Sequence, residues 1–164
     1  MSGEKRFRAA VVTVSDSAAT GRREDLSGPA LVELLTKAGL EVAELLVVPD
    51  DLTQIKAILL RLSGEQRFDF IVTTGGTGFG PRDITPEATL AVIERHANNL
   101  TEMMRVKALS DRPEAALSRG VAGIRGKTLI VNLPGSPEGA SQNLETLLPI
   151  LPHALGLLNG EKLH

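Results

Sequence analysis

The stretch from Phe68 to Ala88, FDFIVTTGGTGFGPRDITPEA, constrains the fold of this chain more than any other part of the sequence. Its first seven residues are mostly apolar or β-branched, which is typical of a buried strand. Thr85 and Pro86 predict a helix start, with Thr85 as the N-cap and Pro86 in the first helical position. Between these two elements lie four glycines: Gly75, Gly76, Gly78 and Gly80.

A glycine-rich loop between a strand and a helix favours an anion site. Glycine allows backbone N–H groups to turn toward a phosphate, and the helix N-terminus adds partial positive charge. The alternative is a tight turn without a ligand, which rarely needs so many glycines because each one costs conformational entropy. Two common phosphate motifs are absent: the dinucleotide pattern G-x-G-x-x-G fails at Pro81, and the P-loop pattern G-x-x-x-x-G-K-[ST] does not occur.

Size and composition indicate a globular protein. The 164 residues suffice for one sizeable core, so we expect a single domain over residues 1–164. A net charge of −2 and an aromatic content of 2% argue against nucleic acid or anionic membranes as partners. The lack of cysteine excludes disulfides, thiolate metal sites and a cysteine nucleophile. Without a convincing signal peptide or a membrane-length apolar stretch, the expected location is cytoplasmic.

Further strands and helices alternate along the chain. Apolar runs predict strands at residues 8–14, 41–48 and 127–133, and a short edge strand at 120–125. Periodicity and start signals predict helices at residues 27–38, 52–62, 86–96, 100–110, 113–119 and 138–148, with a last one reaching 158 after a break near Pro149 and Pro152. Ser27 and Asp51 are the expected N-caps of the first two helices. This alternation predicts an α/β fold with a mostly parallel, doubly wound sheet.

Each strong strand runs into a polar or glycine-rich loop. Ser-Asp-Ser begins at residue 15, Pro-Asp-Asp at 49, the glycine loop at 75 and Pro-Gly-Ser-Pro at 134. Doubly wound sheets bind ligands beyond the carboxyl ends of their strands, so we expect the four loops to form one site. A Ser-His-Asp hydrolase does not fit, because none of His96, His153 and His164 lies on such a loop.

Asp50 and Asp83 each lie just past a predicted strand end, beside the phosphate loop. Two such carboxylates would hold Mg²⁺, which prefers carboxylate, phosphate and water oxygens and neutralises a polyphosphate during phosphoryl or nucleotidyl transfer. The alternative is structural: Asp83 caps the next helix, while Asp50 and Asp51 terminate a strand. Two roles are also open for Arg82, which either contacts phosphate or pairs with Asp83.

Four motifs together carry a family resemblance. TTGGTGFGPRDITPEAT, with VPDD upstream and NLPGSP downstream, resembles the molybdopterin-binding domain of molybdenum-cofactor biosynthesis, which also occurs in gephyrin. The resemblance extends from VVTVSD through DLSGP and AGIRGKTLIVNLPG to TLLPILPHAL. It implies a three-layer α/β/α fold that assembles as a homotrimer. The implied reaction is the Mg²⁺- and ATP-dependent adenylylation of molybdopterin with release of pyrophosphate, and the implied partner is a separate molybdate insertase.

The resemblance also assigns expected roles to residues. Asp50 and Asp83 match two acidic positions of the family, which makes them the expected catalytic residues and Mg²⁺ ligands. One departure is Ser136, where some relatives carry a larger amide, although serine keeps the capacity for hydrogen bonding. The residues expected to bind molybdopterin or ATP are Ser15, Asp16, Gly75, Gly76, Thr77, Gly78, Arg82, Pro134, Gly135 and Ser136.

Three functional hypotheses follow. The first is a molybdopterin adenylyltransferase. The second is a non-catalytic molybdopterin-binding or carrier module of the same pathway, against which the two acidic residues Asp50 and Asp83 count. The third is an assembly scaffold comparable to the oligomerising domain of gephyrin. Pyrophosphate release in the presence of ATP and molybdopterin separates the first hypothesis from the other two.

Overall fold

The computed structural model describes residues 6–64 and 67–162. Both ends of the expected domain, and with them His164, lie outside the described residues. The described strands form one sheet in the order β2-β1-β3-β6-β5-β4. Neighbours among β2, β1, β3 and β6 are parallel, while β5 runs antiparallel to β6, and β4 runs antiparallel to β5. The predicted mostly parallel sheet is therefore confirmed, with the bounds β1 Arg8–Val14, β2 Glu41–Val48, β3 Phe70–Thr74, β4 Arg95–His96, β5 Ala122–Arg125 and β6 Thr128–Leu133.

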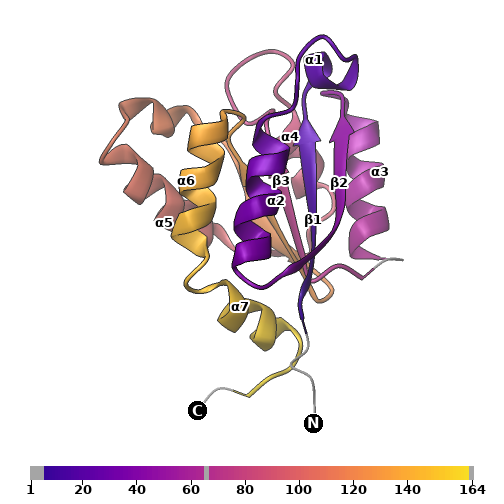
Figure 1. Ribbon diagram of the computed structural model, residues 1–164, viewed down its shortest axis with the longest axis vertical. Helices are drawn as coiled ribbons and strands as arrows, with labels where there is room; N and C mark the ends of the chain where they lie inside the picture. The colour runs from indigo at the N-terminus through magenta and orange to yellow at the C-terminus, as the bar shows by residue number, and fades with distance from the viewer. Residues whose placement is uncertain (1–5, 65–66, 163–164) are drawn as a thin grey trace.

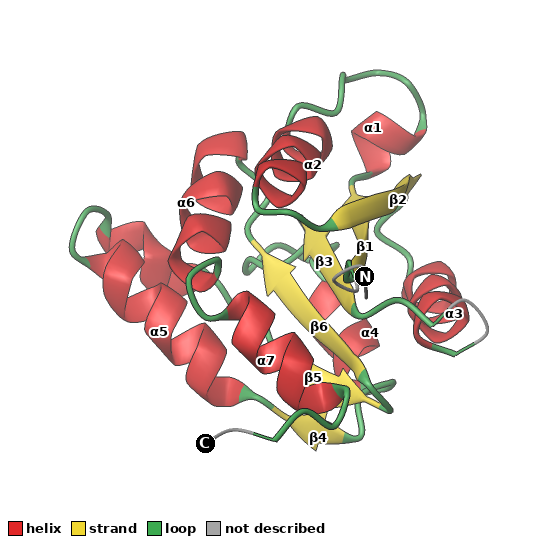
Figure 2. Ribbon diagram, turned by 60° about the horizontal axis from the view of Figure 1, so that its bottom comes forward, coloured by secondary structure: helices red, strands yellow, loops and turns green. Residues whose placement is uncertain are grey.

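Helices cover both faces of the sheet and give the three-layer α/β/α arrangement (Figures 1 and 2). One buried apolar cluster joins one sheet face to α2, α5, α6 and α7, and a second joins the other face to α3 and α4. No described helix has the length and apolar character needed to cross a membrane. The helical elements are α1 Asp16–Ala19, α2 Ser27–Lys37, α3 Leu52–Ser63, α4 Thr85–Leu90, α5 Asn98–Leu109, the 3₁₀ helix η1 Pro113–Leu117, α6 Pro137–Leu147 and α7 Leu151–Leu158.

The structure corrects the prediction for residues 86–96. Helix α4 ends at Leu90, and the backbone N–H groups of Glu94 and Ala97 donate to the carbonyls of Ile124 and Ala122 in β5. The two-residue strand β4 therefore forms the sheet edge that was predicted for β5. A strand this short has no periodicity of its own, so only pairing with β5 defines it.

Two predicted helix caps are also wrong, and one is confirmed. Ser27 and Thr85 are the first residues of their helices rather than N-caps. At α2 the Asp25 side chain accepts the Gly28 N–H at 2.9 Å, which leaves the Ser27 hydroxyl free to donate to the Gly135 carbonyl at 2.7 Å. Asp51 caps α3 as predicted, because its side chain accepts the N–H of Gln54.

In the Gly-Lys-Thr triplet at residues 126–128, Gly126 and Lys127 form the turn between β5 and β6, and Thr128 is the first residue of β6. Gly126 adopts a φ of +59°, a left-handed conformation that glycine accommodates without a steric penalty. A phosphate loop of the P-loop type joins a strand to a helix, so this hairpin turn is not one.

Asn132 ties together several elements beneath the carboxyl ends of the central strands. Its side chain is buried, and Nδ2 donates to Thr73 Oγ1 in β3 at 2.9 Å and to Thr89 Oγ1 in α4 at 3.0 Å. Its Oδ1 accepts the N–H of Val121 at 3.1 Å, just before β5. Every polar atom of this buried amide is thus paired, which favours a single arrangement of the elements around it.

We expect Asn132→Ala to lower the free energy of unfolding by about 2–4 kcal/mol, because it removes the partner of the Val121 N–H and of the buried Thr73 and Thr89 hydroxyls and opens a cavity. Urea denaturation measures this loss. The control is Asn99→Ala, which changes an exposed asparagine and is expected to stay within about 0.5 kcal/mol of the unchanged protein. Equal losses in the two variants would contradict the structural role of the Asn132 network.

Candidate functional site

The carboxyl ends of four parallel strands meet at the upper edge of the sheet in Figure 1. Backbone hydrogen bonds join the segments that leave these strands: Ser15 N–H donates to the Val48 carbonyl at 2.9 Å, and Gly75 N–H donates to the Leu133 carbonyl at 3.1 Å. Thr74 Oγ1 also donates to the Pro134 carbonyl. The four predicted loops therefore form one continuous surface.

Two glycines of the loop after β3 are required by its path. Gly75 and Gly76 have φ angles of +102° and +69°. A Cβ at Gly75 would lie 2.2 Å from the Val14 carbonyl oxygen, and one at Gly76 would lie 2.3 Å from Thr85 Oγ1. Thr85 closes the loop from the helix side, since its Oγ1 donates to the Gly75 carbonyl and its N–H donates to the Gly76 carbonyl. The loop is held between the end of β1 and the start of α4.

The same loop folds around the side chain of Asp83. Gly80 N–H donates to Asp83 Oδ2 at 2.8 Å, and a Cβ at either Gly78 or Gly80 would lie 2.9 Å from that oxygen. The alternative that Asp83 merely caps α4 is wrong, because the N-cap residue is Ile84 and no side chain caps that end of the helix. Asp83 is a member of the loop.

Asp50 is joined to Asp16 across the ends of β1 and β2. Asp16 N–H donates to Asp50 Oδ2 at 3.0 Å, and Asp50 N–H donates to Asp16 Oδ1 at 2.9 Å. Arg82 extends this hydrogen-bond network: its Nε and Nη2 donate to the two carboxylate oxygens of Asp16 at 3.0 and 3.1 Å. Of the two roles considered for Arg82, pairing with Asp83 is therefore wrong: its partner is Asp16.

These contacts shift the pKa values of Asp16 and Asp50 in opposite directions. The hydrogen bond from Arg82 lowers the pKa of Asp16, and the bond from the Asp50 N–H adds to the effect. Burial raises the pKa of Asp50, and the negative charges of Asp16 and Asp83 raise it further against the opposing bond from the Asp16 N–H. The Asp50 carboxylate is the group at this surface whose charge a cation would relieve.

Two clefts meet at the glycine loop. The first, here the acidic cleft, has a volume of about 450 Å³ and is lined on its far side by Ser15, Glu24, Asp25 and Asp50. The second, here the helical cleft, has a volume of about 410 Å³ and lies between α5, η1 and α6. The two clefts share four lining residues: Gly76, Asp83, Gly135 and Ser136.

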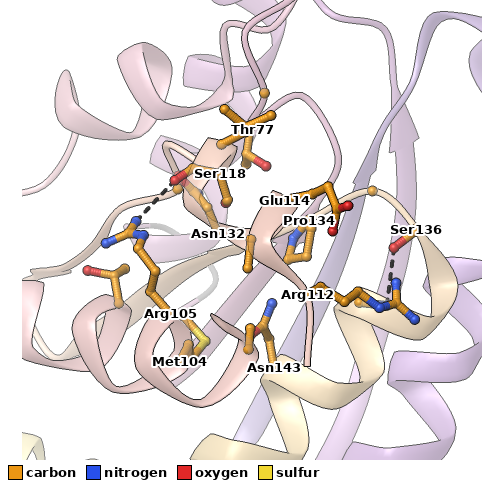
Figure 3. A pocket seen from close by; sticks show the side chains of 18 of the residues that line it. Thr77, Met104, Arg105, Arg112, Glu114, Ser118, Asn132, Pro134, Ser136 and Asn143 are labelled. Carbon is orange, nitrogen blue, oxygen red and sulfur yellow. Dashed lines mark hydrogen bonds between the residues drawn. The ribbon is translucent and has the colours of Figure 1, made fainter. Parts of the chain in front are cut away.

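The helical cleft combines apolar and cationic side chains (Figure 3). Met104 and Leu117 contribute apolar surface and Arg105 contributes positive charge, while Arg112 forms an ion pair with Glu138. Arg105 Nη2 donates to the Ser118 carbonyl at 3.1 Å, which fixes its guanidinium at the rim. This lining suits a flat ring that carries an anionic group.

Ten of the twelve predicted site residues line at least one cleft. Asp16 and Arg82 line neither cleft; they bind each other, and Asp16 also bonds to Asp50, which lines the acidic cleft. Ser136 has a further structural role, since its hydroxyl accepts the Gly139 N–H and caps α6. The ten residues are Ser15, Asp50, Gly75, Gly76, Thr77, Gly78, Asp83, Pro134, Gly135 and Ser136.

Sequence reasoning missed the α5 and α6 side of the site, including Arg105, Arg112 and Asn143. Arg105 and Asn143 lie on helices, where the sequence pattern shows only which face is buried, and Arg112 lies in the short segment between α5 and η1. It also missed Asp25, whose Oδ2 accepts the Thr13 hydroxyl at 2.8 Å. The sequence offers one signal for Asp25: it lies two residues before Ser27, where a helix is predicted to start, and aspartate often caps helix N-termini.

The site could hold a hard cation through oxygen ligands. No group of three or more His, Cys, Asp or Glu side chains in residues 6–64 and 67–162 is arranged to hold a metal ion. Asp50 and Asp83 nevertheless fit Mg²⁺, because that ion takes one or two protein carboxylates and completes its shell with substrate phosphates and water. Burial and the charges of Asp16 and Asp83 raise the pKa of Asp50 despite the opposing charge of Arg82, so a bound cation would stabilise this carboxylate.

Comparisons with known proteins identify the family of the chain. Residues 10–153 match the family described as "Probable molybdopterin binding domain". The chain is 42% identical over 152 residues to a molybdopterin adenylyltransferase from Helicobacter pylori, covering 92% of this chain and 86% of that protein. It is also 42% identical over 141 residues to the Escherichia coli protein of that name, covering 85% and 72%.

Solved structures of similar fold point to the same family. The crystal structure of the molybdopterin biosynthesis enzyme MoaB from Thermus thermophilus has a TM-score of 0.90 to this chain at 49% identity, covering 94% of this chain and 98% of the other. The structure of the molybdopterin biosynthesis Mog protein from Mycobacterium ulcerans has a TM-score of 0.87 at 39% identity, covering 94% and 99%. The chain belongs to the molybdopterin-binding domain family of molybdenum-cofactor biosynthesis.

Proposed function

We propose that this chain is a molybdopterin adenylyltransferase that transfers AMP from ATP to molybdopterin and releases pyrophosphate. The observation that carries this proposal is the meeting of two clefts at Asp83 and three shared residues, Gly76, Gly135 and Ser136. A binding module for one ligand needs one cleft, whereas a transferase must bring two substrates to a common point. The adenylyltransferase names of relatives at 42% identity support the same reaction.

The chemistry of the linings favours one placement of the substrates. The acidic cleft, with Asp50 on its wall, suits the triphosphate of ATP together with Mg²⁺. The helical cleft suits the pterin ring against Met104 and Leu117, with Arg105 near its phosphate. The terminal phosphate oxygen of molybdopterin would then attack the α-phosphorus of ATP near Asp83, and the bond to the pyrophosphate leaving group would break.

The residues of the chain contribute mainly positioning and charge stabilisation. Asp50 and Asp83 would hold Mg²⁺, which supplies positive charge to the phosphates when bound. The N–H groups of the glycine loop would orient the phosphate oxygens, since their carbonyls are held on the other side. A separate molybdate insertase would consume the adenylylated product.

We expect Asp50→Asn and Asp83→Asn to lower kcat for AMP transfer on the order of 100-fold, because each removes a charge that holds the cation. The measurement is transfer of labelled AMP from ATP to molybdopterin, together with pyrophosphate release. The control is Glu33→Gln on the exposed side of α2, which is expected to keep full turnover. Molybdopterin binding without pyrophosphate release from the unchanged protein would instead identify a carrier module.

The raised pKa of Asp50 predicts a pH-dependent affinity for Mg²⁺. Protons compete with the cation for this carboxylate, and the competition extends above its usual value of 3.8. Affinity is therefore expected to rise with pH, by up to about tenfold per unit, until the pKa of Asp50 is passed. Calorimetric titration with Mg²⁺ and a non-hydrolysable ATP analogue measures the slope. A slope that Asp50→Asn leaves unchanged would remove Asp50 from the cation site.

We also propose that the chain assembles as a homotrimer. Edge strand β2 carries Leu45 and Val47, which are 41% and 40% exposed, and a neighbouring copy could cover this apolar surface. Three chains of 17.4 kDa give a mass of about 52 kDa, three times 17.4. Sedimentation equilibrium is expected to show one species of that mass, and a species near 17.4 kDa at micromolar concentration would contradict the trimer.

A further inference from the structure

Arg119 donates hydrogen bonds to three backbone carbonyl groups of the glycine loop. It lies between η1 and β5, and its Nε donates to the Gly78 carbonyl at 2.8 Å. Its Nη2 donates to the Asp83 carbonyl at 2.9 Å, and its backbone N–H donates to the Thr77 carbonyl at 2.7 Å. One residue thus holds both ends of the segment that carries Asp83. It lines neither cleft, so any effect on a ligand must pass through the loop.

Glu87 holds the guanidinium of Arg119 in place. Nη1 lies 2.9 and 3.1 Å from the two carboxylate oxygens, and Nη2 lies 3.1 Å from Oε1. Glu87 belongs to the first turn of α4, the helix that follows the loop directly. The planar fork of arginine can serve a carboxylate and two carbonyls at once, and lysine cannot reproduce that geometry.

The carbonyl contacts determine where two amides point. In a trans peptide the N–H points away from the preceding C=O, and the described chain has no cis peptide bond. The Thr77 and Gly78 carbonyls face Arg119, so the N–H groups of Gly78 and Phe79 face away from it. Within the described residues, neither of these two N–H groups donates a hydrogen bond. Gly78 and Thr77 line the helical cleft, where unpaired backbone donors suit an anion.

We propose that Arg119 is the positioning residue of the site, which aims the Gly78 and Phe79 N–H groups at a substrate phosphate and fixes the backbone of Asp83. This inference rests on the proposed adenylyl transfer for its kinetic consequences. Its structural part, a phosphate-binding pair of amides held from behind by Arg119 and Glu87, concerns binding alone.

A plain surface ion pair would have the same charges without this role. The Arg61–Glu44 pair provides the comparison, with side chains 38% and 28% exposed against 35% and 40% for Arg119 and Glu87. Arg61 lies on α3 and Glu44 on the edge strand β2, away from both clefts. Arg61→Lys therefore makes the same chemical change in a pair of similar exposure.

The test measures phosphate binding, amide by amide, and turnover in the full chain. Inorganic phosphate, the probe for the molybdopterin phosphate assigned to the helical cleft, is expected to shift the amide resonances of Gly78 and Phe79 in the unchanged protein. In Arg119→Lys we expect these shifts to be lost, phosphate affinity to fall about tenfold, and kcat to fall between about 10- and 100-fold. Glu87→Gln keeps the arginine and one acceptor, so a smaller loss is expected. Arg61→Lys is expected to match the unchanged protein in all three measurements.

Several results would overturn the proposal. One is an Arg119→Lys protein that keeps kcat and phosphate affinity within twofold, and another is an equal loss in Arg61→Lys. Phosphate-induced shifts confined to residues other than Gly78 and Phe79 would also do so. If Arg119→Lys fails to fold, Glu87→Gln decides, and unchanged amide shifts there would count against the role. An unchanged protein that binds phosphate at these amides but transfers no AMP would refute the proposed function and leave the positioning role standing.

Discussion

The close approach between the glycine loop and the end of β1 is the constraint on which the site depends. A Cβ at Gly75 would lie 2.2 Å from the Val14 carbonyl oxygen, so only glycine allows the loop to pass there. This passage puts Gly76 against Asp50, whose Oδ1 would lie 3.0 Å from a Cβ at that position. Both clefts exist because the backbone runs between them at this point.

The close packing around the glycine loop also brings three carboxylates near one another. Asp50 is partly buried beside Asp16 and Asp83, and Arg82 forms its hydrogen bonds with Asp16 and acts on Asp50 only through its charge. A raised pKa at Asp50 means that its ionised form costs stability at neutral pH, a cost that grows as the pH rises through that pKa. The charge of Arg82 does not outweigh the burial and the acidic neighbours of Asp50, and this imbalance is consistent with the proposed cation site.

Local sequence patterns predict much of the fold and part of the site, whereas the remaining features depend on tertiary contacts. The four central strands, their polar exits and the capping of α3 by Asp51 followed from apolar runs and residue chemistry. Strand β4 could not be predicted, because its two residues become a strand only by pairing with β5. The helical cleft could not be predicted either, since it arises where α5 packs against α6 and η1. The mistaken caps at Ser27 and Thr85 have the same origin, as both hydroxyls bind distant or preceding loop carbonyls.

Arg119 shows why a motif alone gives an incomplete site. The glycine motif contains the amides and the carboxylate, but its peptide planes could be oriented in several ways because glycine has few conformational limits. Arg119, 36 positions beyond Asp83 in sequence, selects one orientation of these peptide planes, because it binds their carbonyls on the side away from the expected ligand. The permissive backbone that lets the loop approach β1 thus requires a rigid partner on its other side. Arg119, fixed by Glu87, is the described residue that meets this requirement at three carbonyls.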